Sequence, residues 1–322
     1  MTRGIRRRIF LKVAGGILAW PAAALAQQAK AIPRIGVLFI ANPEPFKSAF
    51  LEGLRRRGYV EGQSIHVEFR SADGNPDLLP KLAAEFIQAK VDIIVATQTP
   101  AVQAAKNATT EIPIVMQAGD PVGTGLVASL ARPGGNITGM SSTTAELGGK
   151  TLEFLRELRP ATTRVAVLAN AADPFTKPFL AQLQSAGKVL RIEISPFVVH
   201  GPGEFKSAFT AIAKLRADAV IVQPSLPRKA ALELVMQHRL PSLSPTAAFV
   251  NEGGLLSYSA KLEDQYRGVA DYVDKILKGA KPADLPIQQA STFELAVNLK
   301  TARALGVTIP KSILSRADRV IE

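Results

Sequence analysis

The residues best suited to binding chemistry are small polar side chains that directly follow a short apolar run. The run Ile93–Val95 is typical of a buried parallel strand, and Thr97–Thr99 follow it. Pro100 is a favourable first helical residue, and Thr99 is a favourable cap before it. In open α/β sheets, ligands bind at such turns, where the free N–H groups of a helix N-terminus attract anions. A plain turn with a Thr cap is the alternative. The predicted ligand contacts of this turn are Thr97, Gln98, Thr99 and the backbone amide of Ala101.

Polar residues at comparable places, after other apolar runs, extend this candidate site. They supply hydroxyls, side-chain amides and two acids, which suit a small polar ligand whose carboxylate is held at a helix N-terminus. Each also has a structural alternative: Asp120 and Asp173 precede prolines and would then cap helices, and Tyr258 would be a core residue. The further predicted ligand contacts are Asn42, Asp120, Pro121, Asn170, Asp173, Gln223, Ser225, Thr246, Ala247, Phe249 and Tyr258.

Signatures of enzymes, metal sites and cofactor sites are missing from the sequence. It contains no GxSxG, no GxxxxGK[ST] and no GxGxxG after its first predicted strand. There is no cysteine, and the three histidines, His66, His200 and His238, are far apart. We therefore expect a protein that is not an enzyme, without catalytic residue, metal or cofactor. An exported enzyme that uses Asp120 and Asp173 as an acid/base pair is the alternative hypothesis.

Basic residues are concentrated at the start of the chain. The formal charge is +12, and five of the 39 basic residues lie within residues 1–26, where there is no acid. The others are scattered, without a basic stripe interleaved with aromatic residues, so the composition does not favour nucleic-acid binding.

Residues 1–26 have the pattern of a signal peptide. The basic start is followed by a short apolar stretch, Val13–Trp20, and by the small residues Ala24 and Ala26 before Gln27. We therefore expect cleavage before Gln27 and a periplasmic protein. The paired arginines Arg7-Arg8, followed by Phe10-Leu11-Lys12, favour the twin-arginine export route slightly over the general secretory route.

The order of predicted strands and helices indicates two similar halves. Strands alternate with helices over residues 34–141, including a short helix over residues 122–131, and again over residues 146–259. The turn at Gln223 repeats the design of the Thr97–Thr99 turn. The tail adds a helix over 262–277, a strand over 285–297, a helix over 301–305 and a final helical turn over 317–321.

This order predicts an α/β fold with two doubly wound, Rossmann-like lobes joined by a hinge of several strands. A long helix and a strand placed after both halves fit a chain that crosses between the lobes more than once. The predicted first lobe comprises residues 33–143 plus about 260–285, and the second comprises residues 144–259 plus about 286–322. Polar turns from both lobes would then line one cleft.

Several segments also carry a resemblance to a known family: Arg34–Leu38, Ala131–Gly139, Gly253–Tyr258, Ile276–Pro286, Asn298–Gly306 and Ala317–Glu322. With these segments the chain looks like the periplasmic substrate-binding component of an ABC importer, within the group of TrpX-like proteins that bind tryptophan and tyrosine.

The resemblance implies a type I periplasmic-binding fold with three crossovers between the lobes. It also implies a small-molecule ligand, delivery of that ligand to ABC permease subunits in the membrane, and a receptor that we expect to be monomeric. Aromatic amino acids are bound in the TrpX-like branch, but because the corresponding turns here carry few aromatic residues, a branched-chain or other small carboxylate is an equally open alternative. A sensory ligand-binding module would share the fold. The family's contacts map onto Thr97–Thr99, Asp120, Asn170, Gln223, Ser225 and Thr246–Ala248.

Overall fold

The computed structural model describes residues 32–41, 44–142 and 147–322. The expected signal peptide over residues 1–26 and the expected ligand contact Asn42 lie outside these residues. Among the helices that are described, none combines the length and the apolar character needed to cross a membrane.

The first sheet has six strands in the order β11-β5-β4-β3-β1-β2, and all of its pairings are parallel. Its strands β3, β4 and β5 are buried at every position, as parallel strands covered by helices on both faces should be. The strands are β1 (Arg34–Phe39), β2 (His66–Ser71), β3 (Ile93–Thr97), β4 (Ile114–Ala118), β5 (Ile137–Ser141) and β11 (Gln288–Gln289).

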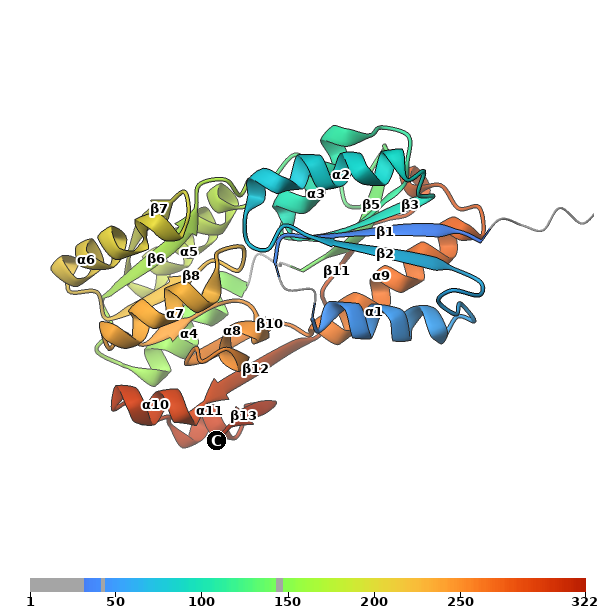
Figure 1. Ribbon diagram of the computed structural model, residues 1–322. Coiled ribbons are helices and arrows are strands. Elements are labelled where there is room, and N and C mark those ends of the chain that lie inside the picture. Colours follow the sequence, from blue (N-terminus) through green and yellow to red (C-terminus); the bar gives the residue numbers. More distant parts are fainter. Residues whose placement is uncertain (1–31, 42–43, 143–146) are drawn as a thin grey trace, which may run out of the picture. The chain divides into compact units, whose positions relative to one another are not determined.

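Helices cover both faces of this sheet (Figure 1). Helices α1 (Phe46–Arg55) and α9 (Leu262–Leu277) share one hydrophobic cluster with the strands, and α2 (Leu79–Gln88) and α3 (Thr99–Ala108) share the other. Helix α9 follows the second half of the chain in sequence, yet Tyr266 packs edge to face on Phe46 of α1. We call this sheet and its helices the first lobe.

The second sheet has seven strands in the order β13-β12-β10-β9-β8-β6-β7. Strand β12 runs antiparallel to β10, and β13 runs parallel to β12. The other pairings are parallel. The strands are β6 (Arg164–Asn170), β7 (Glu193–Val199), β8 (Ala219–Val222), β9 (Ser242–Leu243), β10 (Leu256–Ala260), β12 (Phe293–Asn298) and β13 (Arg319–Ile321).

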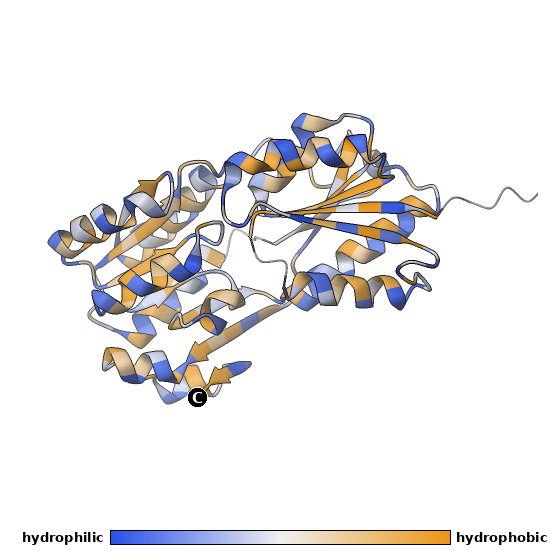
Figure 2. Ribbon diagram, in the orientation of Figure 1, coloured by the Kyte–Doolittle hydropathy of each residue, from blue (hydrophilic) through white to orange (hydrophobic). Residues whose placement is uncertain are grey.

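Two hydrophobic clusters also flank the second sheet, so this lobe is doubly wound like the first (Figure 2). One cluster holds α4 (Leu147–Leu158), α5 (Thr176–Leu190), α10 (Leu299–Leu305) and α11 (Lys311–Leu314). The other holds α6 (Phe205–Leu215), α7 (Arg228–Gln237) and α8 (Ala247–Asn251). Short 3₁₀ turns are η1 (Pro76–Leu78), η2 (Pro202–Glu204) and η3 (Pro282–Asp284). We call this sheet and its helices the second lobe. The α/β fold with two parallel-sheet lobes is thus confirmed.

The chain passes from one sheet to the other three times: after β5, between β10 and α9, and between β11 and β12. Two of these segments are tied together, because the Lys261 N–H donates to the Thr292 carbonyl at 2.9 Å. The Thr292 hydroxyl also donates to Asp264 at 2.7 Å. The last crossing comes later than the expected boundary near residue 285, because β11 pairs with β5 of the first sheet.

Three expected elements differ from the structure. The expected strand over 285–297 is two strands, β11 and β12, that belong to different sheets. The expected final helical turn is strand β13, because pairing with the edge of β12 satisfies backbone groups that a helical turn would leave free. Residues 122–131 form turns instead of a helix, and Gly125 has φ +71°, a conformation that ends any helical run.

Candidate functional site

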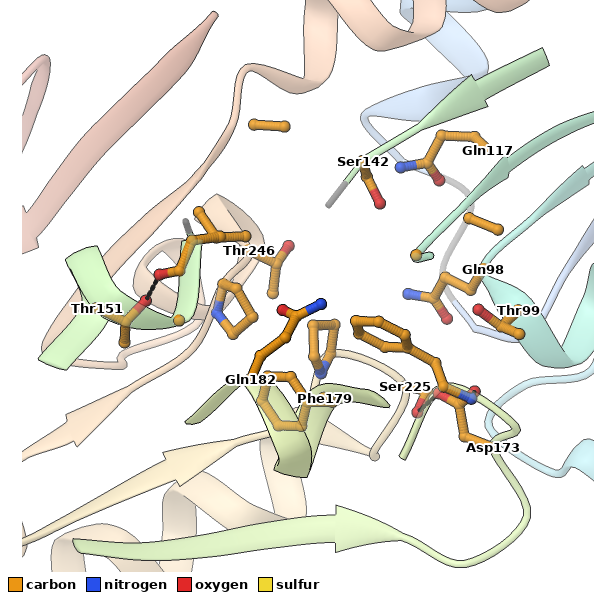
Figure 3. A pocket seen from close by; sticks show the side chains of 18 of the residues that line it. Gln98, Thr99, Gln117, Ser142, Thr151, Asp173, Phe179, Gln182, Ser225 and Thr246 are labelled. Atoms are coloured by element: carbon orange, nitrogen blue, oxygen red, sulfur yellow. Dashed lines mark hydrogen bonds between the residues drawn. The ribbon is translucent and has the colours of Figure 1, made fainter. Parts of the chain in front are cut away.

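A cavity lies where residues of both lobes meet, at the carboxyl ends of strands in each sheet. Its volume is about 110 Å³, which exceeds the space of a single water several-fold and suits a small organic molecule. Figure 3 shows amide and hydroxyl side chains arranged around this space. The lining residues are Gln98, Thr99, Gln117, Ala118, Gly119, Ser142, Leu147, Gly148, Thr151, Asp173, Phe175, Phe179, Gln182, Leu183, Ile221, Pro224, Ser225, Pro245, Thr246, Ala260, Leu262 and Tyr266.

The turn between β3 and α3 brings Gln98 and Thr99 to the cavity. Helix α3 begins at Thr99, so Gln98 occupies the cap position that we had expected for Thr99. No side chain caps this helix end, and Gln98 has φ 66° and ψ 149°. Its N–H donates to the Gln117 carbonyl at 2.7 Å, which joins the turn to the end of β4. The Gln98 side-chain oxygen Oε1 is buried without a hydrogen-bond partner in the described chain.

The second lobe presents a connected network of buried polar side chains. Asp173 Oδ2 accepts hydrogen bonds from Gln223 Nε2 at 2.8 Å and from the Ser225 hydroxyl at 2.6 Å. Gln223 Oε1 accepts from the Asn170 N–H at 2.9 Å and from the Thr176 hydroxyl at 2.8 Å. The network therefore joins the turns after β6 and β8 and holds both in place.

Asp173 is the ionisable member of this network. Burial raises the pKa of its carboxyl, and the hydrogen bonds from Ser225, the Phe175 N–H and Gln223 oppose part of that rise. Asp173 Oδ1 accepts from the Phe175 N–H at 2.9 Å, two residues on, and so fixes the turn before α5. Phe175 is the cap residue of α5 and no side chain caps this helix, so the capping role that we gave as the alternative for Asp173 is wrong. Asp173 lines the cavity.

Aromatic and aliphatic side chains form the apolar part of the lining. Phe175 comes from the turn just before α5 and Phe179 from the first turns of α5, with ring centroids 5.7 Å apart, and Tyr266 comes from α9. Phe175 also meets the first lobe: an added Cβ at Gly119 would lie 2.9 Å from its ring. The lobes thus approach each other so closely at this point that only a glycine fits.

The cavity is nearly free of charge. Among the described lining residues, Asp173 is the single acid, and there is no lysine, arginine or histidine. In the same part of the chain, no group of three or more histidine, cysteine, aspartate or glutamate residues is placed to hold a metal ion. A ligand carboxylate would therefore be met by neutral donors, namely side-chain amides, hydroxyls and backbone N–H groups.

Five of the expected contacts lie together in the lining, and they come from both lobes: Gln98, Thr99, Asp173, Ser225 and Thr246. Two other expected contacts, Asn170 and Gln223, do not line the cavity but belong to the buried network that includes the lining residue Asp173. Thr97 ends β3 and Ala101 is fully buried in α3, and neither lines the cavity. The Ala101 backbone amide, in the first turn of α3, stays a predicted contact.

The remaining expected contacts have structural surroundings instead. Asp120 Oδ1 accepts from the Gly123 N–H at 2.9 Å and so caps the turn in which the buried Pro121 lies. Phe249 is fully buried in the core and Ala247 nearly so. Tyr258 packs on Phe154 and Phe293 with centroid distances of 5.1 and 5.7 Å. None of these five residues lines the cavity.

Most of the apolar lining was not among the predicted contacts, which came mainly from turns. Phe175 and Phe179 stand four residues apart, the spacing that places two side chains on one helix face. Tyr266 lines the cavity from the helix predicted over residues 262–277. The predicted turns carry few aromatic residues, as expected, but the cavity gains Phe175 from the turn before α5 and Phe179 and Tyr266 from helices.

Comparisons with known proteins agree with this architecture. The chain is 28% identical over 266 residues to a tyrosine-binding protein of Clostridioides difficile, covering 80% of this chain and 76% of that protein. The structure of an ABC domain from Streptococcus pneumonia in complex with L-tryptophan has a TM-score of 0.81 and 28% identity, covering 90% of this chain and 99% of that one. A conserved domain protein from Vibrio cholerae has a TM-score of 0.84 and 27% identity, with the same coverage.

These relatives are substrate-binding proteins or share their fold, and solute-binding proteins of more distant sequence have the same type I fold. The family model described as ABC transporter substrate binding protein matches residues 43–321, which is most of the chain. The chain therefore belongs to the family of ABC transporter substrate-binding proteins and is of the TrpX-like kind.

Proposed function

We propose that this protein is the extracytoplasmic receptor of an ABC importer and that it binds an amino acid with an apolar, preferably aromatic, side chain. The observation that carries the proposal is the composition of the cavity. One part is aromatic and aliphatic, another part consists of neutral hydrogen-bonding groups, and the single charged side chain is the buried Asp173.

The polar groups suit the two charged ends of an amino acid. Helix α3 begins at the cavity, with Thr99 in the lining. The N–H groups and the dipole at its N-terminus favour a carboxylate by roughly 0.3–1 kcal/mol, and by up to ~2 kcal/mol in a partly buried site. The ammonium group would lie toward Asp173, whose buried carboxylate has no cationic partner in the lining.

The apolar groups suit the side chain of the ligand. Phe175, Phe179 and Tyr266 offer ring faces and edges to an indole, a phenol or a branched aliphatic group. Two relatives support the aromatic choice: one is a tyrosine-binding protein and one was solved with L-tryptophan. A related carboxylate without the amino group is the alternative ligand.

Membership of the family implies membrane permease subunits as partners, and substrate-binding proteins of ABC importers act outside the cytoplasm. We propose that residues 1–26 direct export, by the twin-arginine or the general secretory route, and that the mature chain works as a monomer without binding nucleic acid. The protein would release its ligand from the cavity to the permease when the two lobes separate.

The experiment is a thermal-shift screen of the mature chain followed by calorimetric titration. The compounds are L-tryptophan, L-tyrosine, L-phenylalanine, L-leucine and their deaminated acids. We expect saturable binding without turnover, and a stabilisation of about 2.7 kcal/mol when the ligand concentration is 100 times Kd. Phe179→Leu should weaken binding of the aromatic ligands, while the control Val189→Ala, at a residue that is 82% exposed, should not. A folded protein that responds to none of these compounds would contradict the proposal.

A further inference from the structure

The backbone of Gln98 has a conformation that is unusual for its residue type. Its φ of 66° and ψ of 149° lie in a region that is populated essentially only by glycine. Other residues with positive φ, such as Arg191 and Arg216, have ψ of 43° and 47° and occupy the milder left-handed helical region. Gln98 is therefore a strained residue, and it lines the cavity.

Two backbone hydrogen bonds hold this conformation. The Gln98 N–H donates to the Gln117 carbonyl at 2.7 Å, and the Gln98 carbonyl accepts from the Val102 N–H at 3.2 Å. The first fixes the residue to the end of β4, and the second starts the hydrogen-bond ladder of α3. Neither bond requires a glutamine side chain, so a glycine would serve the fold at this position with less strain.

The side chain carries a second unfavourable feature. Its Oε1 is buried and has no hydrogen-bond partner in the described chain, and a buried acceptor without a partner destabilises a protein. Two destabilising features thus meet in one residue of the cavity (Figure 3). The unpaired oxygen is explained if a bound solute brings the missing donor, and the strained backbone is explained if it holds that oxygen in place for the solute.

The charge of the lining indicates which donor this is. Asp173 is its single charged side chain, and no cation compensates it among the described lining residues. An N–H donor that carries positive charge would satisfy the Gln98 oxygen and also be attracted by Asp173. An amino acid has such a donor, whereas its deaminated analogue does not.

We propose that Gln98 determines the specificity of the cavity by accepting a hydrogen bond from the ammonium group of the solute, in a backbone conformation that destabilises the ligand-free protein. This inference rests on the proposed function and adds to it the group that distinguishes an amino acid from a plain carboxylate.

Three substitutions and one control test the proposal. Gln98→Met keeps the length of the side chain and removes the acceptor. Gln98→Glu keeps an acceptor oxygen and removes the amide donor. Gln98→Gly relieves the strain. The control Arg216→Gly removes the Cβ from another residue with positive φ, at the end of α6 and outside the lining. Each variant is titrated with whichever of L-tryptophan, L-tyrosine and L-leucine the wild type binds, and with the deaminated analogue of that amino acid.

We expect Gln98→Met to weaken binding of the amino acid roughly 10-fold to 100-fold, and to leave binding of the deaminated acid nearly unchanged. Gln98→Glu should bind the amino acid within a few-fold of the wild type. Gln98→Gly should raise the Tm of the ligand-free protein by about 2–4 °C and weaken amino-acid binding, whereas Arg216→Gly should leave that binding unchanged.

Two results would overturn the inference. In the first, Gln98→Glu loses as much affinity for the amino acid as Gln98→Met does, or Gln98→Met weakens binding of the amino acid and of its deaminated analogue equally. Gln98 would then donate a hydrogen bond to the ligand carboxylate. In the second, Gln98→Gly lowers the Tm. The proposed function fails separately, when the wild type binds none of the compounds, and the Tm of Gln98→Gly still tests the strain in that case.

Discussion

Two glutamines stand at corresponding places in the two lobes, and they differ in almost every physical respect. Gln98 follows β3 of the first sheet and Gln223 follows β8 of the second. The side-chain oxygen of Gln98 has no partner in the described chain, while that of Gln223 accepts two hydrogen bonds. Gln98 lines the cavity, whereas Gln223 is fully buried behind it.

The difference shows that topological equivalence places a residue near a site without deciding its role. Gln223 uses its hydrogen-bonding capacity on Asn170, Asp173 and Thr176, so it builds the second lobe's part of the site. The Gln98 acceptor has no such partner in the described chain, and we propose that a ligand supplies one. The hydrogen-bond partners of each polar atom separate the two roles, and residue type and position do not.

The largest effect on stability should come from removing the Gln223 side chain, which holds the buried network of the second lobe. Gln223→Ala removes the acceptor of the buried Asn170 N–H and one of the hydrogen-bond donors to the buried Asp173 carboxylate. We expect the free energy of unfolding to fall by about 3 kcal/mol, measured by denaturant unfolding. Gln98→Ala should change it by less than about 1 kcal/mol. If the two variants were equally destabilised, the assignment of a structural role to Gln223 and a ligand-binding role to Gln98 would be wrong.

A smaller effect should follow from altering the contact between the two lobes. Gly119→Ala places a methyl group 2.9 Å from the Phe175 ring, and such overpacking costs about 1–3 kcal/mol. Ligand affinity should therefore fall about 10-fold or more in calorimetric titration. Gly149→Ala is the matched control, because an added Cβ there has no neighbour within 4 Å. Unchanged affinity in Gly119→Ala would show that this contact is not part of the ligand-bound arrangement.

The free energy of unfolding should depend on pH through Asp173, the single acid among the described lining residues of the cavity. Burial raises the pKa of Asp173 above 3.8, so the folded state binds this proton more tightly than the unfolded chain. The contribution of Asp173 to the free energy of unfolding should therefore fall as the pH rises from 3.8 through the folded-state pKa of this carboxyl. Asp173→Asn lacks this ionisation, and its stability relative to the wild type should rise over that interval. Denaturant unfolding at several pH values measures both, and parallel curves would contradict the assignment.

The smallest effect is expected at Tyr258, a predicted contact that lies outside the lining. Its ring packs between Phe154 and Phe293, and Tyr258→Phe keeps this packing. Affinity and the free energy of unfolding should both stay within about 0.5 kcal/mol of the wild type. A clear loss of affinity, with stability unchanged, would bring this residue into the site.

The fold was largely predictable because its central strands are buried on both faces and therefore appear as continuous apolar runs, such as Ile93–Val95 and Arg164–Ala169. The errors fell on elements that depend on distant partners. Residues 319–321 form a strand only because β12 offers them an edge, and local composition favoured a helical turn there.

The candidate site was predictable in location but not in the role of each residue. Polar turns after strands identified Gln98, Thr99, Asp173, Ser225 and Thr246. The aromatic lining residues Phe179 and Tyr266 were missed because they lie on helices, whose apolar faces also serve the core. The network around Gln223 could not be foreseen, because it joins residues about 50 positions apart through a strand pairing that the sequence does not show.

The three passages of the chain between the sheets have a consequence for synthesis of the protein. The first 142 residues supply five strands of the first sheet, but α9, which covers one of its faces with Tyr266, Val269 and Tyr272, is encoded more than a hundred residues later. The second sheet likewise waits for β12. Neither lobe is complete until the last tens of residues have left the ribosome. We therefore expect the growing chain to expose an apolar face of the first sheet until α9 has been synthesised, which is the kind of surface that chaperones bind.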